Sequence, residues 1–78
     1  MVDIIFTKFD EKGEISSCMK VGSVPSTEAA EEKMTSMFVN FCRDVSKKPL
    51  ERRHYANGFE WMYHGLKHQL NYIPEEVS

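Results

Sequence analysis

The sequence predicts a small α+β domain in which an N-terminal β-hairpin is followed by two amphipathic helices, a ββαα arrangement. Three observations predict this fold class. Residues 2–9 are rich in β-branched and aromatic side chains, and residues 15–21 alternate between the two faces of a strand beyond a glycine-containing turn, as two paired strands do. Residues 27–48 and 50–72 repeat apolar side chains at spacings of three and four, which is the period of a helix. The whole chain of 78 residues is short enough to form one domain.

The hairpin comes first along the chain. Residues 2–9 are rich in β-branched and aromatic side chains and carry apolar groups on both faces of the expected strand. The turn DEKGE follows, where Gly13 can take the positive φ that a short hairpin loop requires. Residues 15–21 alternate again and read as the return strand. An isolated hairpin is marginal in water, so we expect it to pack on the helices, extend through a dimer, or both.

The first helix is expected over residues 27–48. Ser26 or Thr27 is the expected N-cap, and acidic residues from Glu28 onward suit the positive end of the helix dipole. The apolar positions form one stripe that core packing explains; they are Ala30, Met34, Met37, Phe38, Phe41, Cys42 and Val45.

The second helix is expected over residues 50–72, stopped by Pro74 and followed by a short acidic tail at 75–78. On a helical wheel one stripe would pack on the core: Tyr55, Phe59, Met62, Tyr63, Leu66, Leu70 and Ile73. A second stripe would lie on the opposite side: His54, Asn57, Trp61, His64, His68 and Tyr72. Gly58 and Gly65 would stack between the two stripes, either to relieve crowding against the first helix or because another group approaches closely there.

The second stripe is the candidate interface. Trp and Tyr are enriched at protein–protein contacts because each joins a large apolar area to one polar group. The alternative is that the hairpin of the same chain covers this stripe. We therefore expect a non-enzymatic protein-binding module, in the style of the small inhibitors or regulators encoded by phages and mobile elements. A short chain has a marginal core, which favours a homodimer.

A basic turn between the helices supports the alternative function of a small nucleic-acid-associated regulator. Lys47, Lys48, Arg52 and Arg53 gather there, and a helix N-terminus near Pro49 would add backbone N–H groups for an anion or phosphate. The net charge of −2 excludes a generally basic, DNA-coating surface and is too small for an acidic DNA mimic.

Metal and nucleophile chemistry are not expected. Glu60, His64 and His68 recur at a spacing that could chelate zinc, but the metalloprotease signature HExxH is absent and hydrogen-bonding interface histidines are the better interpretation. Cys18 and Cys42 are expected to be reduced, buried and inert. We expect no catalytic residue, no metal and no cofactor.

The expected location is the cytoplasm. Two cysteines are too few for a secreted disulfide framework, and no charged leader precedes the first strand. No window approaches the roughly 18 consecutive apolar residues of a membrane span, so a membrane is not an expected partner.

Overall fold

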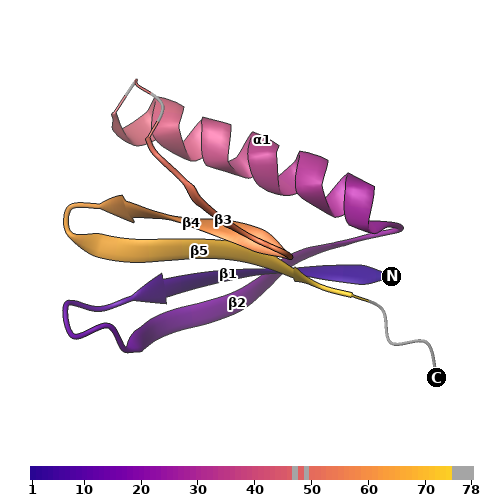
Figure 1. Cartoon of the computed structure of the whole chain (residues 1–78), viewed down its shortest axis with the longest axis horizontal. Helices are drawn as coiled ribbons and strands as arrows, with labels where there is room; N and C mark the ends of the chain where they lie inside the picture. The colour runs from indigo at the N-terminus through magenta and orange to yellow at the C-terminus, as the bar shows by residue number, and fades with distance from the viewer. Residues whose placement is uncertain (47, 49, 75–78) are drawn as a thin grey trace.

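A five-stranded antiparallel sheet with one helix packed on one side forms the part of the chain that the computed structural model describes, residues 1–46, 48 and 50–74 (Figure 1). The elements in chain order are β1 (Val2–Phe9), β2 (Ile15–Val24), α1 (Thr27–Val45), β3 (Arg53–Tyr55), β4 (Gly58–Tyr63) and β5 (Leu66–Ile73). The fold is therefore ββαβββ, and the predicted ββαα arrangement is wrong.

The strands lie in the order β2-β1-β5-β4-β3. Three of the four pairings are hairpins between neighbours in the sequence, and the fourth joins the first strand to the last. This β1–β5 pairing runs from Asp3 opposite Ile73 to Lys8 opposite His68. β1 and β5 are consequently the central strands, each paired on both sides.

The predicted helix over residues 50–72 is the error, because this segment forms β3, β4 and β5. Of its two interior glycines, Gly65 lies in the turn between β4 and β5, and Gly58 begins β4 directly after the turn from β3. His64 (φ 54°) and Gly65 (φ 76°) form a two-residue turn between the paired residues Tyr63 and Leu66. Positive φ at both turn positions matches the right-handed twist of the flanking strands, which is why this turn closes a hairpin instead of continuing a helix.

The turn from β3 to β4 is held against β5 by Tyr72. The Tyr72 N–H donates to the Asn57 carbonyl at 2.9 Å, and the Asn57 side-chain amide donates back to the Tyr72 carbonyl at 3.0 Å. The Tyr72 hydroxyl donates to the Ala56 carbonyl at 3.3 Å. Gly58 follows directly, and a Cβ there would overlap the Leu70 carbonyl oxygen and the Asn71 backbone. Only glycine lets β4 approach β5 this closely.

The N-terminal hairpin and the first helix are present as predicted, with different ends. β2 continues to Val24, and Gly13 (φ 83°) occupies the turn, where the Asp10 carboxylate accepts from the Lys12 and Glu14 backbone N–H groups at 2.9 Å. Ser26 caps α1 by accepting from the Ala29 N–H at 3.2 Å. Lys47, Pro49 and the tail at 75–78 lie outside the described residues.

The hydrophobic core lies between α1 and the face of the sheet that α1 covers. α1 contributes its predicted stripe, with Ala30, Met34, Phe38 and Cys42 buried, and the sheet contributes alternate positions of β1, β4 and β5. Because successive strand residues point to opposite faces, these positions are Val2 and Ile4, then Phe59 and Trp61, then His68, Leu70 and Tyr72. The Trp61 ring meets Phe38 and Phe41 edge-to-face, at centroid distances of 5.0 and 5.3 Å.

Candidate functional site: the open face of the sheet

The predicted interface residues do not form one surface. Trp61, His68 and Tyr72 are only 3%, 7% and 8% exposed and lie beneath α1. His54 is exposed on β3, and its ring contacts Phe59 with centroids 5.8 Å apart. His64 is exposed at the β4–β5 turn, and Asn57 is half-buried in the β3–β4 turn. The exposed aromatic face depended on a helix that does not exist, so Trp61 is a core residue.

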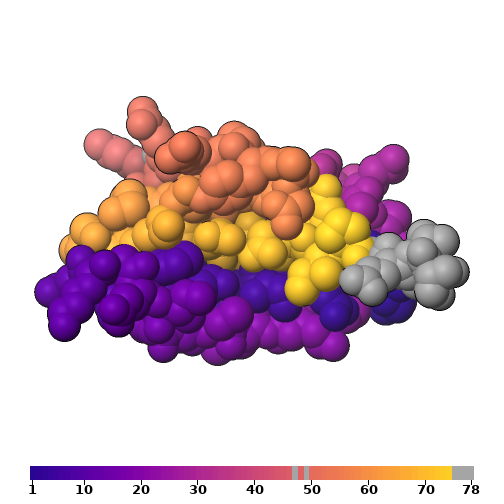
Figure 2. All heavy atoms as spheres, turned by 60° about the horizontal axis from the view of Figure 1, so that its bottom comes forward, coloured from indigo at the N-terminus to yellow at the C-terminus, as the bar shows by residue number. Residues whose placement is uncertain are grey.

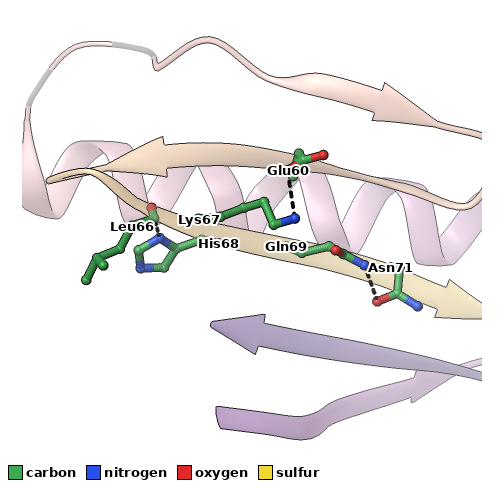
Figure 3. A network of polar contacts seen from close by, with 6 residues as sticks. All are labelled: Glu60, Leu66, Lys67, His68, Gln69 and Asn71. Atoms are coloured by element: carbon green, nitrogen blue, oxygen red, sulfur yellow. Dashed lines mark hydrogen bonds and ion pairs between the residues drawn. The ribbon is translucent and has the colours of Figure 1, made fainter. Parts of the chain in front are cut away.

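His68 is buried among the aromatic rings that lie beneath α1. Its ring stacks on Trp61 and Phe6, with centroids 5.8 and 6.1 Å away, and lies 5.3 Å from the Phe41 ring. Nδ1 lies 3.1 Å from the Leu66 carbonyl oxygen, which can only accept, so the neutral ring carries its proton on Nδ1 (Figure 3). Burial lowers the pKa of His68, and the nearby charge of Lys8 lowers it further, while the bond to Leu66 opposes them. Burial beneath α1 therefore favours the neutral form of the ring.

The three residues with zinc-like spacing are dispersed by the sheet. His68 points under α1, His64 lies in a turn, and Glu60 lies on the opposite face, where its carboxylate is 3.7 Å from the Lys67 ammonium. Among the described residues there is no group of three or more His, Cys, Asp or Glu side chains that could hold a metal ion.

The basic residues of the alternative hypothesis are also divided. The Arg52 guanidinium stacks over Phe38 and Phe59, at 4.6 and 5.0 Å from their ring centroids, on the side of α1. Arg53 is paired with Glu60, so its side chain belongs to the other face of the sheet. Lys48 is exposed, and Lys47 lies outside the described residues. Arg52 and Arg53 line one pocket, but Glu51 and Glu60 line it too, so the described bases do not form an unopposed site for phosphate.

The two cysteines are free and lie on opposite sides of the sheet. Cys42 is buried on the side of α1 that faces the sheet. Cys18 is exposed, which corrects the expectation that both cysteines are buried. The Thr7 hydroxyl donates to the Cys18 sulfur at 3.6 Å, on the face away from α1. A bond between the two sulfurs would require the sheet to open.

The face of the sheet away from α1, called the open face below, is the extended surface that the described elements leave uncovered. Figure 2 shows it, with β1 and β2 below, β5 across the middle and β3 and β4 above. The strand registers place one residue of each strand in a row across it: Cys18, Thr7, Gln69, Glu60 and Arg53. The odd-numbered residues of β1 and β5 and the even-numbered residues of β4 point to this face.

Polar side chains at the centre of the open face bind one another. The Gln69 amide donates to the Asn71 side-chain oxygen at 3.4 Å, and Lys67 reaches Glu60 on the neighbouring strand (Figure 3). Towards β2, the Ser23 hydroxyl donates to the Asp3 carboxylate at 2.7 Å. The centre is thus organised rather than loosely solvated.

Apolar side chains surround this polar centre. Met62, Ile73 and Tyr55 are 55%, 50% and 38% exposed, and the register assigns all three to the open face. The Lys67 ammonium lies over the Phe9 ring, 4.2 Å from its centroid. The sequence argument missed this surface because it assigned Tyr55, Met62 and Ile73 to the buried stripe of a helix. Alternation with period two in residues 58–63 and 66–73 is the signal that identifies them.

Within the described residues, no helix combines the length and the apolar character that crossing a membrane requires. Comparison with protein-family models, curated proteins and solved structures found no match to this chain.

Proposed function

We propose that this chain is a non-enzymatic protein-binding module that acts in the cytoplasm and binds a larger protein through the open face of its sheet. The observation that carries the proposal is the composition of that face. An antiparallel sheet can leave one face to water, but such a face is then polar. Here exposed Met62, Ile73 and Tyr55 surround an organised polar centre, a mixture typical of interfaces between separately folded proteins.

The size of the face supports a protein partner. The molecule measures 40 × 26 × 19 Å along its principal axes, and the strands run along the longest of them (Figure 1). A standard interface buries about 800 Å² on each partner, which a face of this extent can supply. Binding a larger protein in this way would suit an inhibitor or regulator.

The charges of the face also favour a protein over a nucleic acid. Lys20 and Asp3 approach to 3.9 Å, and Lys67 faces Glu60, so acids and bases alternate. A phosphate backbone is bound by unopposed cations, because affinity comes from neutralised phosphates and released counterions. The exposed thiol of Cys18 suits a reducing compartment.

The test begins with affinity capture from the native host and identification of the partner by mass spectrometry, followed by a dissociation constant measured with both purified proteins. A double variant, Met62→Glu with Ile73→Glu, adds a charge near each end of the open face. We expect it to raise the dissociation constant at least about tenfold, because charges replace apolar contact area at the interface.

The matched control is Val39→Glu. Val39 is 45% exposed on α1, away from the open face, so this variant should bind like the unmodified protein. Equal affinity of the double variant, with its circular-dichroism spectrum unchanged, would contradict the proposal. Co-purification with nucleic acid that salt removes would favour the alternative function.

A further inference from the structure

The outer edge of β2 is the longest unpaired strand edge among the described residues. β2 pairs with β1 on one side, and no described strand lies on its other side (Figure 1). It spans 10 residues, whereas β3 at the opposite edge spans 3. We propose that a second copy of the chain pairs with this edge. The two β2 strands would lie antiparallel and form one continuous sheet across both copies.

β2 has few of the features that normally protect a sheet edge. Natural edge strands are kept short or carry several charges or a proline, because unpaired backbone N–H and C=O groups attract other strands. β2 contains one charged residue, Lys20, and no proline. Its large apolar residues Ile15 and Met19 are 63% and 52% exposed.

Two register shifts confine the pairing to the middle of β2. They fall opposite Ile4/Ile5 and opposite Lys8/Phe9, and between them Ser17–Lys20 pair regularly with β1. Bulges bend and twist a strand locally, so the ends of β2 are poorer templates than this regular stretch. A short paired stretch gives a modest contact, below the roughly 1,200 Å² of a stable interface, and hence a weak dimer.

The sequence of this stretch is compatible with pairing to itself. A two-fold axis perpendicular to the sheet keeps both helices on the same side, and it makes one residue of β2 face its own copy. With Cys18 on that axis, Ser17 faces Met19 within the regular stretch, and the sole charged residue, Lys20, comes opposite Ser16 at the register shift. No like charges then meet directly across the strands, an arrangement that would be unfavourable. The open faces of the two copies would also become continuous.

This inference does not depend on the proposed function, and its test keeps the two apart. The molar mass of the purified chain is measured by sedimentation equilibrium from about 10 to about 500 µM, a range suited to a weak interface. We expect the mass to rise from monomer to dimer. Met19→Lys should raise the dimer dissociation constant at least about tenfold, because lysine on an edge opposes strand addition. The control is Val39→Lys, which places the same charge at an exposed apolar residue of α1 away from β2, and it should dimerise like the unmodified protein.

The register is tested by oxidation of the unmodified protein with diamide, which removes the two thiol hydrogens as a Cys18–Cys18 disulfide forms between copies. Cross-strand neighbours lie within reach of such a bond. Cys18→Ser should prevent the cross-link and still sediment as a dimer. A monomer throughout the concentration range, or a dimer that survives in folded Met19→Lys, would overturn the proposal. The Met62 and Ile73 variants should dimerise normally, so loss of partner binding and loss of dimerisation are separate outcomes.

Discussion

Trp61 shows how one residue changes its role when its element changes. On a helix it would be the centre of an exposed patch, whereas on β4 its ring is enclosed by Phe38, Phe41 and Phe59. Its indole Nε1 is buried without a hydrogen-bond acceptor among the described residues. An unsatisfied buried donor carries a free-energy penalty, so the packing of the ring must outweigh it.

Trp61→Ala should therefore destabilise the fold rather than a complex. Removing a buried Trp costs about 3–5 kcal/mol, which is a large fraction of the stability of a small domain. We expect a loss of native circular dichroism or a much lower urea midpoint. Met62→Ala, the neighbour that points to the open face, should change stability little. A Trp61→Ala protein with an unchanged midpoint would show that the ring is not in the core.

His68 should make stability depend on pH. Burial, reinforced by Lys8, lowers the pKa of His68 in the folded protein, whereas the unfolded chain has a histidine pKa of about 6.5. As the pH falls below that value, the unfolded state binds a proton that the folded state resists. The free energy of unfolding should accordingly be highest, as far as His68 is concerned, above the pKa of His68 in the unfolded chain. It should fall as the pH drops towards the lower pKa of His68 in the folded protein.

The measurement compares urea unfolding between about pH 7.5 and about pH 5 in the unmodified protein and in His68→Phe, whose ring fits an aromatic cluster. The difference between the two proteins isolates His68 from every other titratable group. His68→Phe should lose less stability in acid. His54→Phe, a substitution at an exposed histidine, should keep the full pH dependence. Identical pH profiles for the His68 variant and the unmodified protein would contradict this account.

At the scale of elements, the error in residues 50–72 has an identifiable cause. The buried side chains of β4 are at odd-numbered residues (Phe59, Trp61), and those of β5 are at even-numbered residues (His68, Leu70, Tyr72). The two-residue turn at His64 and Gly65 shifts the phase by one. Phe59, Tyr63, Leu66 and Leu70 then recur at spacings of four, three and four, which imitates a helix. The β3–β4 loop consists of Ala56 and Asn57, and Gly58 already pairs with Tyr55, so the Asn57–Gly58 dipeptide does not occupy the loop positions that its sequence suggests.

α1 could be predicted because it contains one uninterrupted helical period that begins at a local signal, the N-cap Ser26, and the hairpin because Gly13 marks its turn. The pairing of β1 with β5 could not be predicted, since it joins residues 60 to 70 positions apart and no local pattern encodes it. The open face depends on this pairing. Its residues were visible in the sequence, but their assembly on one surface was not.

Substitution by alanine should lower the free energy of unfolding more at Gly58 than at Gly65. At Gly65 there is open space, so Gly65→Ala suffers only from the left-handed backbone, about 1–2 kcal/mol. At Gly58 the added Cβ would overlap the Leu70 carbonyl, and β4 would have to move away from β5. Chemical denaturation should show Gly58→Ala to be the more destabilised. The reverse order would mean that β4 and β5 are not in this close register.

At the scale of the whole molecule, the strand order makes the two ends of the chain mutually dependent. β1 and β5 occupy the centre of the sheet, although they lie near the N- and C-terminal ends of the described chain. α1 covers only one face, so the protection of each strand is set mainly by how many neighbours it pairs with. Stability should consequently decrease from the centre of the sheet to its edges.

Native-state hydrogen exchange of dilute protein tests this gradient. Amides of β1 and β5 that bond to a neighbouring strand should exchange slowest. Exposing them to solvent requires a central strand to separate from both of its neighbours, which is close to unfolding the whole domain. Amides of β3, which pairs over three residues, should exchange fastest among the strands. On β2 the inward amides bonded to β1 should be protected and the outward ones should not, unless the concentration is raised until copies pair. Uniform protection of the amides over residues 50–72, as in a helix, would instead show that this segment is helical and would exclude the β1–β5 pairing.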